Sequence, residues 1–402
     1  MLECKYLQHS ITIEPDGKVK PCCRYTEPSV DYSSHSQLFS VARQQMREGK
    51  WALGCSRCST EESRGNSSMR TNSLKPYNKF NRAPQHDSNK LTYLEITTGR
   101  YCNLKCRMCD PVLSTSWDED LEHSEPLVKW FYGSFGAWEQ DKSQPKTTNT
   151  MLELDRDACS SLREIKVTGG EPFLSEYLAQ FLQRLVDWDL ASNITLDIFT
   201  NATFIPKHKY IKNFNKFNTV FLNMSIDGTG ARGEFIRKKS DWSKVKETVA
   251  WYCKQHIENK NIYLGISHTQ SLYNVLYYRE FIDWCTSNIN DAILNDKESF
   301  FLNTTQLSEP KHLSIYNLNN KQKQQALQVI DNDFNSFDFN NSKWHRQIQY
   351  SLTQLKNSLA VTLEDTTTSA INDFNKHERI VDAVRQENWA TVFPRLEELL
   401  NE

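Results

Sequence analysis

Cysteines are the residues of this 402-residue sequence with the clearest chemical meaning, and eight of the eleven lie before residue 110. Cys102, Cys106 and Cys109 follow the spacing C-x3-C-x2-C. Thiolates are soft ligands that select iron–sulfur clusters, zinc or copper(I). A structural zinc site usually recruits a fourth Cys or His, and the first His after the motif is His123. The three cysteines therefore favour an iron–sulfur cluster that keeps one iron open for a substrate.

The cysteine motif follows a strand-like run, residues 91–99. Together the two segments resemble the signature of the radical S-adenosylmethionine (radical SAM) family. The resemblance implies that Cys102, Cys106 and Cys109 hold a [4Fe–4S] cluster whose fourth iron binds S-adenosylmethionine. It also implies reductive cleavage of this cofactor to a 5′-deoxyadenosyl radical. The family usually has an aromatic residue just before the third Cys, against the adenine, and we expect Met108 to supply apolar packing there.

Three later segments, each ending a strand-like run, resemble further motifs of the same family. EIKVTGGEP (164–172) resembles the glycine-rich motif, ITLDIFTNAT (194–203) the third strand, and FLNMSIDG (221–228) the fourth strand. Ala202 stands where the family often has glycine. Turns and a solvated salt bridge are the alternative interpretations of these residues. The resemblance implies that S-adenosylmethionine contacts Gly169, Gly170, Glu171, Pro172, Asn201, Ser225, Asp227 and Arg237.

The first sixty residues hold a second group of thiols. A predicted β-hairpin, residues 10–22, and a predicted helix, residues 36–49, are expected to bring these thiols together. Four thiolates can close either a zinc site or an iron–sulfur site. The candidate ligands are Cys4, Cys22, Cys55 and Cys58.

The G-x4-C spacing from Gly17 to Cys22 resembles the first half of an auxiliary domain called SPASM, or its shorter form, twitch. The resemblance implies an auxiliary [4Fe–4S] cluster that serves electron transfer, here placed before the barrel rather than after it. The spacing favours Cys22 over Cys23 as the ligand. A zinc ribbon is the alternative.

Strand-like and helix-like segments alternate from residue 90 to residue 305, which predicts βα units and a parallel sheet. Most motif residues stand at the C-terminal ends of strands, where parallel α/β folds build their sites. This pattern fits the family's partial (β/α)6 TIM-like barrel, an α/β fold. The predicted strands are residues 91–98, 164–168, 194–200, 219–226, 262–268 and a sixth near 299–304.

We expect three regions: a cysteine-rich hairpin-plus-helix domain (1–75), the barrel (90–305) and a helical C-terminal region (306–402). Residues 59–90 read as a polar linker, and the Asn-rich run 331–342 as a loop. Residues 111–150, which contain three Trp, are an expected insertion. We interpret the insertion as helical cover for the barrel, with a substrate lid as the alternative.

Charge and hydropathy exclude several classes of protein. The 48 Lys and Arg against 50 Asp and Glu give a formal net charge of −2, so binding to nucleic acid is not expected. No apolar run approaches the roughly 20 residues that cross a bilayer. The start, MLECKYLQHS, lacks the pattern of a secretory signal. We therefore expect a cytoplasmic protein without a membrane partner.

These observations predict a radical SAM enzyme that abstracts hydrogen from a peptide, protein or small molecule, in an oxidoreductase or bond-forming reaction. The resemblance implies an electron donor such as a flavodoxin or a ferredoxin. The alternatives are a non-enzymatic iron–sulfur or zinc protein in electron transfer or assembly, and a nucleic-acid-modifying radical SAM enzyme. No catalytic acid or base is assigned, because abstraction of a hydrogen atom needs none in its first step.

Overall fold

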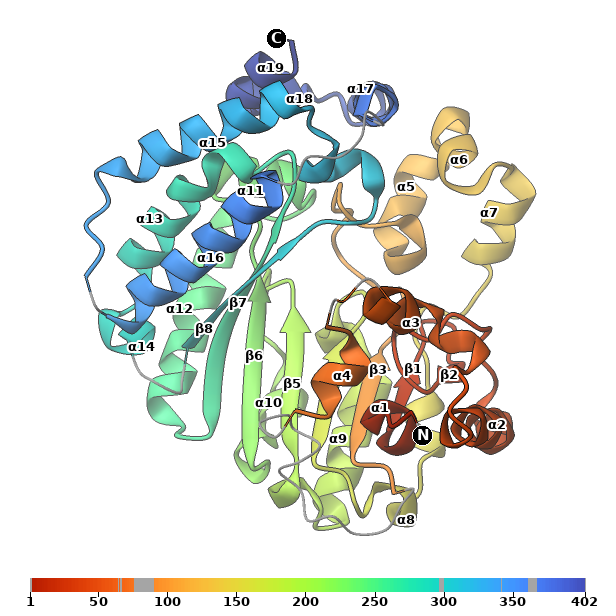
Figure 1. Ribbon diagram of the computed structural model, residues 1–402. Coiled ribbons are helices and arrows are strands. Elements are labelled where there is room, and N and C mark those ends of the chain that lie inside the picture. Colours follow the sequence, from red (N-terminus) through yellow and green to blue (C-terminus); the bar gives the residue numbers. More distant parts are fainter. Residues whose placement is uncertain are drawn as a thin grey trace. The chain divides into compact units, whose positions relative to one another are not determined.

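The computed structural model describes residues 2–63, 65, 67–75, 90–295, 300–340, 342–360 and 367–401. Figure 1 shows the helices and strands in their order along the chain. The chain forms two compact units, and it passes from one to the other five times. The predicted domain limits do not follow these units and stay a prediction. The first unit comprises Met1–Tyr101, Pro145–Phe199 and Pro206–Phe221, and the second Cys102–Gln144, Thr200–Ile205 and Leu222–Glu402.

The strands have the order β2-β1-β3-β4-β5-β6-β7-β8. β1 pairs antiparallel with β2, whereas the pairs β1–β3, β3–β4, β4–β5 and β7–β8 are parallel. The predicted α/β fold with a mostly parallel sheet is therefore confirmed. The strands are β1 Ser10–Ile13, β2 Val19–Lys20, β3 Tyr93–Thr97, β4 Glu164–Thr168, β5 Thr195–Thr200, β6 Thr219–Ser225, β7 Ile262–Gln270 and β8 Phe300–Gln306.

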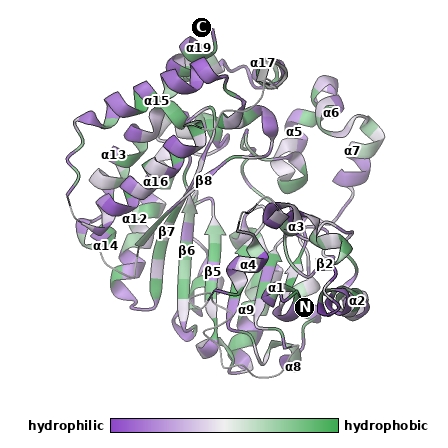
Figure 2. Ribbon diagram, in the orientation of Figure 1, coloured by the Kyte–Doolittle hydropathy of each residue, from purple (hydrophilic) through white to green (hydrophobic). Residues whose placement is uncertain are grey.

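Apolar residues of neighbouring strands lie opposite one another in the sheet. Val167 of β4 lies opposite Ile96 of β3 and Ile198 of β5, and all three side chains are buried. The neighbouring position across the same strands carries Glu95, Lys166 and Asp197, because side chains alternate between the two faces of a sheet. Figure 2 shows hydrophobic residues along the strands. This alternation explains why the sequence located the strands well.

The N-terminal hairpin forms as predicted, with Thr12 of β1 opposite Lys20 of β2. In addition, β1 lies parallel to β3, with Thr12 opposite Glu95. The sequence did not predict this second pairing. The hairpin therefore continues the sheet of the first unit.

Helix α9 of the first unit begins with a clear cap. Ser175 accepts a hydrogen bond from Leu178 N at the start of α9, and Phe181 and Leu185 are buried on its inner face. Helix α2 corresponds to the predicted helix 36–49. The helices of this unit are α1 Lys5–His9, α2 His35–Arg47, α3 Ser56–Ser63, α4 Met69–Ser73, α8 Arg156–Cys159, α9 Glu176–Asp187 and α10 His208–Ile211.

In the second unit, the expected insertion folds into three short helices. Trp117, Leu127 and Trp138 from the insertion form a core cluster with Val381 of α17. Its aromatic side chains are thus used largely in packing. The helices of this unit are α5 Asp118–Leu121, α6 Glu125–Tyr132, α7 Phe135–Lys142, α11 Gly230–Ile236, α12 Trp242–Glu258, α13 Tyr278–Asn288, α14 Asp291–Asn295, α15 Asn320–Asn335, α16 Lys343–Ala360, α17 Thr367–Arg385, α18 Trp389–Val392 and α19 Pro394–Asn401.

The predicted helical C-terminal region is confirmed. The predicted loop 331–342 is wrong for its first five residues, which continue α15 because Phe334 follows Ile330 at helical spacing and both are buried. Residues 76–89 of the predicted linker, and residue 299 of the sixth strand, lie outside the described residues. Within the described chain, no helix combines the length and apolar character needed to span a bilayer.

Candidate functional site

The three motif cysteines lie together on the loop that follows β3. Cys102 and Cys106 are buried, and Cys109 is partly buried beside them around Leu104. A turn closed by Cys109 N donating to Cys106 O, at 3.1 Å, brings the last two cysteines together. Cys102 Sγ accepts a hydrogen bond from Leu104 N at 3.4 Å. The three cysteines, which are close in sequence, thus also lie close together in the structure.

The thiols of this loop influence each other strongly. A hydrogen bond with Cys109 and burial raise the pKa of Cys106 well above its ordinary value. The same hydrogen bond lowers the pKa of Cys109. Arg237 also acts on both thiols by favouring their thiolates. The loop therefore offers soft donors beside the partly buried positive charge of Arg237.

Asn201, which follows the third predicted strand, lies against the cysteine loop. Its Nδ2 donates to Asn103 Oδ1 at 2.8 Å and lies 3.9 Å from Cys102 Sγ. Its Oδ1 accepts hydrogen bonds from the backbone N and the hydroxyl of Thr203. The intervening Ala202 is buried at a φ of 54°, the left-handed region that glycine adopts most readily. The turn keeps this conformation although the family's glycine is absent.

Arg237, which is partly buried, forms an ion pair with the buried Asp227, with 2.6 Å between Arg237 Nη2 and Asp227 Oδ2. The other carboxylate oxygen of Asp227 accepts a hydrogen bond from Thr269 N at 2.8 Å. Burial acts to lower the pKa of Arg237, but Asp227, Cys106 and Cys109 raise it above its ordinary value. Arg237 is therefore charged. Ser225 ends β6 two residues before Asp227, and Met108 lies partly buried in the turn of the cysteine loop.

The GGEP segment belongs to the first unit, where its glycines permit close backbone packing. Gly169 has a φ of 130°, and a Cβ there would lie 2.7 Å from Thr98 N. A Cβ on Gly170 would lie 2.3 Å from Tyr101 O. Glu171 is buried and accepts a hydrogen bond from Phe173 N at 3.2 Å, at the start of the turn that Pro172 opens. These residues fix the chain that leads into the cysteine loop.

The four N-terminal candidate ligands line one cavity in the first unit. The cavity is small, with a volume of about 20 Å³, and Trp51 and Arg70 also line it. Cys4 lies just before α1, and Cys22 follows β2. Cys55 lies just before α3, and Cys58 lies in the first turn of α3. The cysteines in question are Cys4, Cys22, Cys55 and Cys58.

Cys23 does not line this cavity. Its thiol forms a hydrogen bond with Glu95 instead. Burial raises the pKa of Cys22, and burial raises that of Cys55 to about 12. Both thiols would release a proton on binding a metal. In the described part of the chain, no three His, Cys, Asp or Glu side chains converge closely enough to hold a single metal ion.

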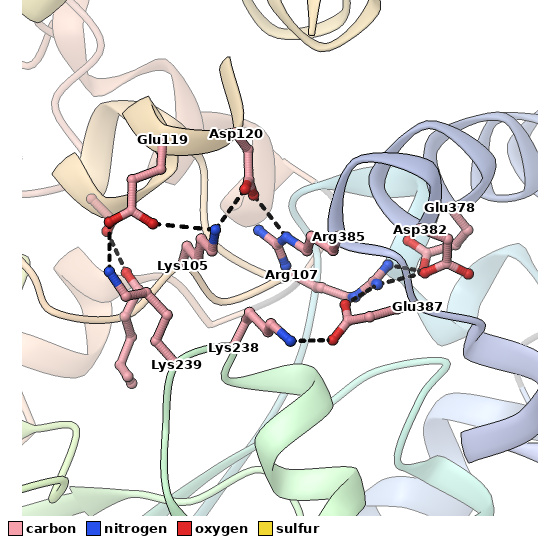
Figure 3. A network of polar contacts seen from close by, with 12 residues as sticks. Lys105, Arg107, Glu119, Asp120, Lys238, Lys239, Glu378, Asp382, Arg385 and Glu387 are labelled. Carbon is pink, nitrogen blue, oxygen red and sulfur yellow. Dashed lines mark hydrogen bonds and ion pairs between the residues drawn. The ribbon is translucent and has the colours of Figure 1, made fainter. Parts of the chain in front are cut away.

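The sequence analysis missed one group of residues around the cysteine loop. Lys105 and Arg107 stand between the motif cysteines and form ion pairs with carboxylates of α5 and of the C-terminal region (Figure 3). No local pattern marks these pairs, because Arg107 and Glu378 are 271 residues apart. The only sequence signal is the presence of two basic residues inside the motif.

Residues 96–271 match the sequence model of the radical SAM superfamily. Among curated relatives, the GTP 3′,8-cyclase of Aliarcobacter butzleri (strain RM4018) is 24% identical over 163 residues, which are 40% of this chain and 42% of the relative. That of Sulfurimonas denitrificans (strain ATCC 33889 / DSM 1251) is 30% identical over 112 residues, 27% of each chain. The chain thus spans less than half the length of these relatives.

Solved structures show more distant likeness. Streptococcus suis SuiB bound to its precursor peptide SuiA has 12% identity and a TM-score of 0.36, over 70% of this chain and 60% of that one. The structure titled native anSMEcpe with bound AdoMet and Cp18Cys peptide has 16% identity and a TM-score of 0.36, over 61% of this chain and 60% of that one.

Proposed function

We propose that this chain, whose residues 96–271 form a radical SAM domain, is an enzyme that cleaves S-adenosylmethionine reductively and uses the 5′-deoxyadenosyl radical to remove hydrogen from a substrate. The cysteine loop is the observation that carries the proposal. Cys102, Cys106 and Cys109 gather on one loop beside Asn201 and the partly buried charge of Arg237. A [4Fe–4S] cluster held by these soft donors supplies an electron and one open iron for the cofactor.

The chain's own residues would do three things in this reaction. The cysteine thiols lose their protons on binding iron, and Arg237 favours the thiolates. The guanidinium of Arg237 is suited to a carboxylate of the cofactor, since Arg binds carboxylates bidentately. Gly169 and Gly170 permit the tight backbone of the GGEP turn, and the family resemblance assigns Glu171 and Pro172 in that turn to the amino group of S-adenosylmethionine. Met108, Ser225 and Asp227 complete the proposed cofactor site.

We further propose that the N-terminal cavity holds an auxiliary [4Fe–4S] cluster that exchanges electrons with the substrate. Four thiols line this cavity, and the neighbouring Cys23 faces Glu95, which supports Cys22 as the ligand. A cluster with four protein thiolates has no open iron, so its role would be electron transfer. A zinc ion is the other occupant that four thiolates suit.

The substrate is proposed at the level of class. The curated relatives are named GTP 3′,8-cyclases, which supports a small molecule. A peptide remains the second candidate, and an electron donor such as a flavodoxin or ferredoxin would supply the reducing electron.

Anaerobic iron counting tests the proposal. We expect about eight irons per chain after reconstitution, and about four after Cys102, Cys106 and Cys109 are all replaced by Ala. The wild-type protein, reduced with S-adenosylmethionine, should form 5′-deoxyadenosine, and the variant should form none. Replacing Cys4, Cys22, Cys55 and Cys58 by Ala should also leave about four irons.

A matched control replaces Cys159, Cys253 and Cys285, which are buried singly away from both sites, by Ala. This variant should keep the full iron content. Iron without any 5′-deoxyadenosine in the wild type would contradict the enzyme and favour an electron carrier. Zinc retained at the N-terminal set would contradict the auxiliary cluster.

A further inference from the structure

A network of ion pairs surrounds the cysteine loop within the second unit (Figure 3). It joins side chains from the loop, from α5, from the segment after α11, and from α17 and the residues that follow it. Five of its members are basic and five are acidic, so their formal charges cancel. The members are Lys105, Arg107, Lys238, Lys239, Arg385, Glu119, Asp120, Glu378, Asp382 and Glu387.

Arg107 is the centre of this network. It stands between Cys106 and Met108, is 1% exposed, and meets three carboxylates. The distances are 2.5 Å to Glu378 Oε2, 2.5 Å to Asp382 Oδ1 and 2.7 Å to Glu387 Oε2. Its guanidinium carbon lies 3.9 Å from the centre of the Phe235 ring. A planar group held on several sides can adopt only one position.

The backbone of the loop is held at the same points. Arg107 N donates to Ile236 O at 2.8 Å, and Lys105 N donates to Lys238 O at 3.1 Å. Lys105 Nζ lies 2.6 Å from Asp120 Oδ1. Cys106 lies directly between Lys105 and Arg107 in the sequence. Contacts that hold these two cations in place therefore hold Cys106 from both sides.

The C-terminal region closes the network. Asp120 also pairs with Arg385 of α17 at 2.7 Å, and Glu387 pairs with Lys238 at 2.6 Å. Buried ion pairs contribute little net stability compared with apolar packing. We therefore explain these ion pairs by their effect on the cysteine loop, which they hold in one position.

We propose that residues 378–387 brace the cysteine loop, with Lys105 and Arg107 as positioning residues that set how the three thiols present themselves. This inference rests on the proposed function, because it assigns the thiols to a cluster. It gives the C-terminal region a role that the sequence did not indicate.

The test uses the full chain with Asp382→Asn and Glu387→Gln combined. We expect wild-type iron content after reconstitution, but iron loss to a chelator at least tenfold faster. The change that S-adenosylmethionine causes in the electron paramagnetic resonance spectrum of the reduced cluster should be altered. The conservative double variant Asp382→Glu and Glu387→Asp, which keeps both charges, should retain most of the wild-type behaviour.

The matched control is Asp333→Asn. Asp333 is a partly buried carboxylate that pairs with Arg395 at 2.8 Å outside the network. It should leave iron loss and spectrum unchanged. Circular dichroism and the thermal midpoint verify that each variant folds. Wild-type spectrum and wild-type iron loss in the double variant would overturn the brace.

A separate measurement keeps the brace testable if the proposed function fails. In the protein without iron, alkylation of Cys102, Cys106 and Cys109 by iodoacetamide is followed by peptide mass spectrometry. We expect at least tenfold faster alkylation in the double variant than in the wild type or in Asp333→Asn. Equal rates would overturn the brace whether or not the wild type cleaves S-adenosylmethionine.

Discussion

Glu378 is a carboxylate with no exposed surface, held between a cation and an imidazole. It accepts from Arg107 at 2.5 Å and contacts His377 Nδ1 at 2.8 Å. Burial acts to raise its pKa, but Arg107 and His377 lower it to about 2. A folded-state pKa below the unfolded value of about 4.3 means that this carboxylate stabilises the fold above that pH. The contribution is lost as the pH falls towards 2.

We therefore predict that Glu378→Gln lowers the free energy of unfolding by about 3 kcal/mol at pH 7, since one pKa unit corresponds to about 1.4 kcal/mol. Between about pH 5 and pH 2, wild-type stability should fall more steeply than that of the variant. Denaturant titrations at several pH values measure both effects.

Glu398→Gln, at an exposed position of α19, is the control and should follow the wild-type pH profile. Parallel pH profiles for wild type and Glu378→Gln would contradict the prediction.

At the scale of residues, the sequence located motif positions but not the contacts that hold them. Cys102, Cys106 and Cys109 come together because they are close in the chain. The sequence did not predict that Asn201 would lie beside Cys102. The partners of Arg107 lie 271 to 280 residues away, and nothing in the sequence marks which carboxylates it meets. Proposed contacts with S-adenosylmethionine stay predictions.

The GGEP turn is packed so closely against neighbouring backbone that its two glycine positions have no room for a side chain. A Cβ on Gly170 would lie 2.3 Å from Tyr101 O and 2.6 Å from Tyr101 C, both backbone atoms that cannot easily move. We predict that Gly170→Ala lowers the free energy of unfolding by about 2–3 kcal/mol, the cost of overpacking. Thermal or denaturant unfolding measures the change.

Gly136→Ala is the matched control for this prediction. Gly136 lies inside α7, and a Cβ there would have no atom within 4 Å. Ala should raise the free energy of unfolding by about 0.5–1 kcal/mol, because Gly is the poorer helix former. Equal effects of the two substitutions would contradict the steric argument.

At the scale of elements, local periodicity predicted the strands and the longer helices. The pairing of β1 with β3 was not predicted, because some eighty residues separate Thr12 from Glu95. In addition, either strand of a hairpin has a free edge with which a further strand can pair. The sequence did not predict that Trp117 and Trp138 would share a core with Val381.

Each of the two units is built from separate stretches of the sequence, because the chain passes between the units five times. The second unit combines Leu222–Glu402 with Cys102–Gln144 and Thr200–Ile205. Trp117 and Arg107, which pack against Val381 and Glu378, therefore come from a distant part of the chain.

We predict that a fragment of residues 222–402 does not fold alone. Without residues 102–144, Val381 loses its buried partners and Glu378 keeps a charge without Arg107, which is strongly destabilising. Calorimetry should show no cooperative transition for the fragment, in contrast to the full chain. A sharp transition would contradict the prediction.

The pairing of Arg107 with residues near the end of the chain also has a consequence for biosynthesis. At translation rates of about 5–20 residues per second, roughly 14–56 seconds pass between the synthesis of Arg107 and that of Asp382 and Glu387. Asp382 and Glu387 must also leave the exit tunnel of the ribosome before their carboxylates reach the loop. The nascent cysteines spend this interval without their final neighbours, so the proposed cluster would be inserted only after residues 378–387 have emerged and the loop has its finished shape.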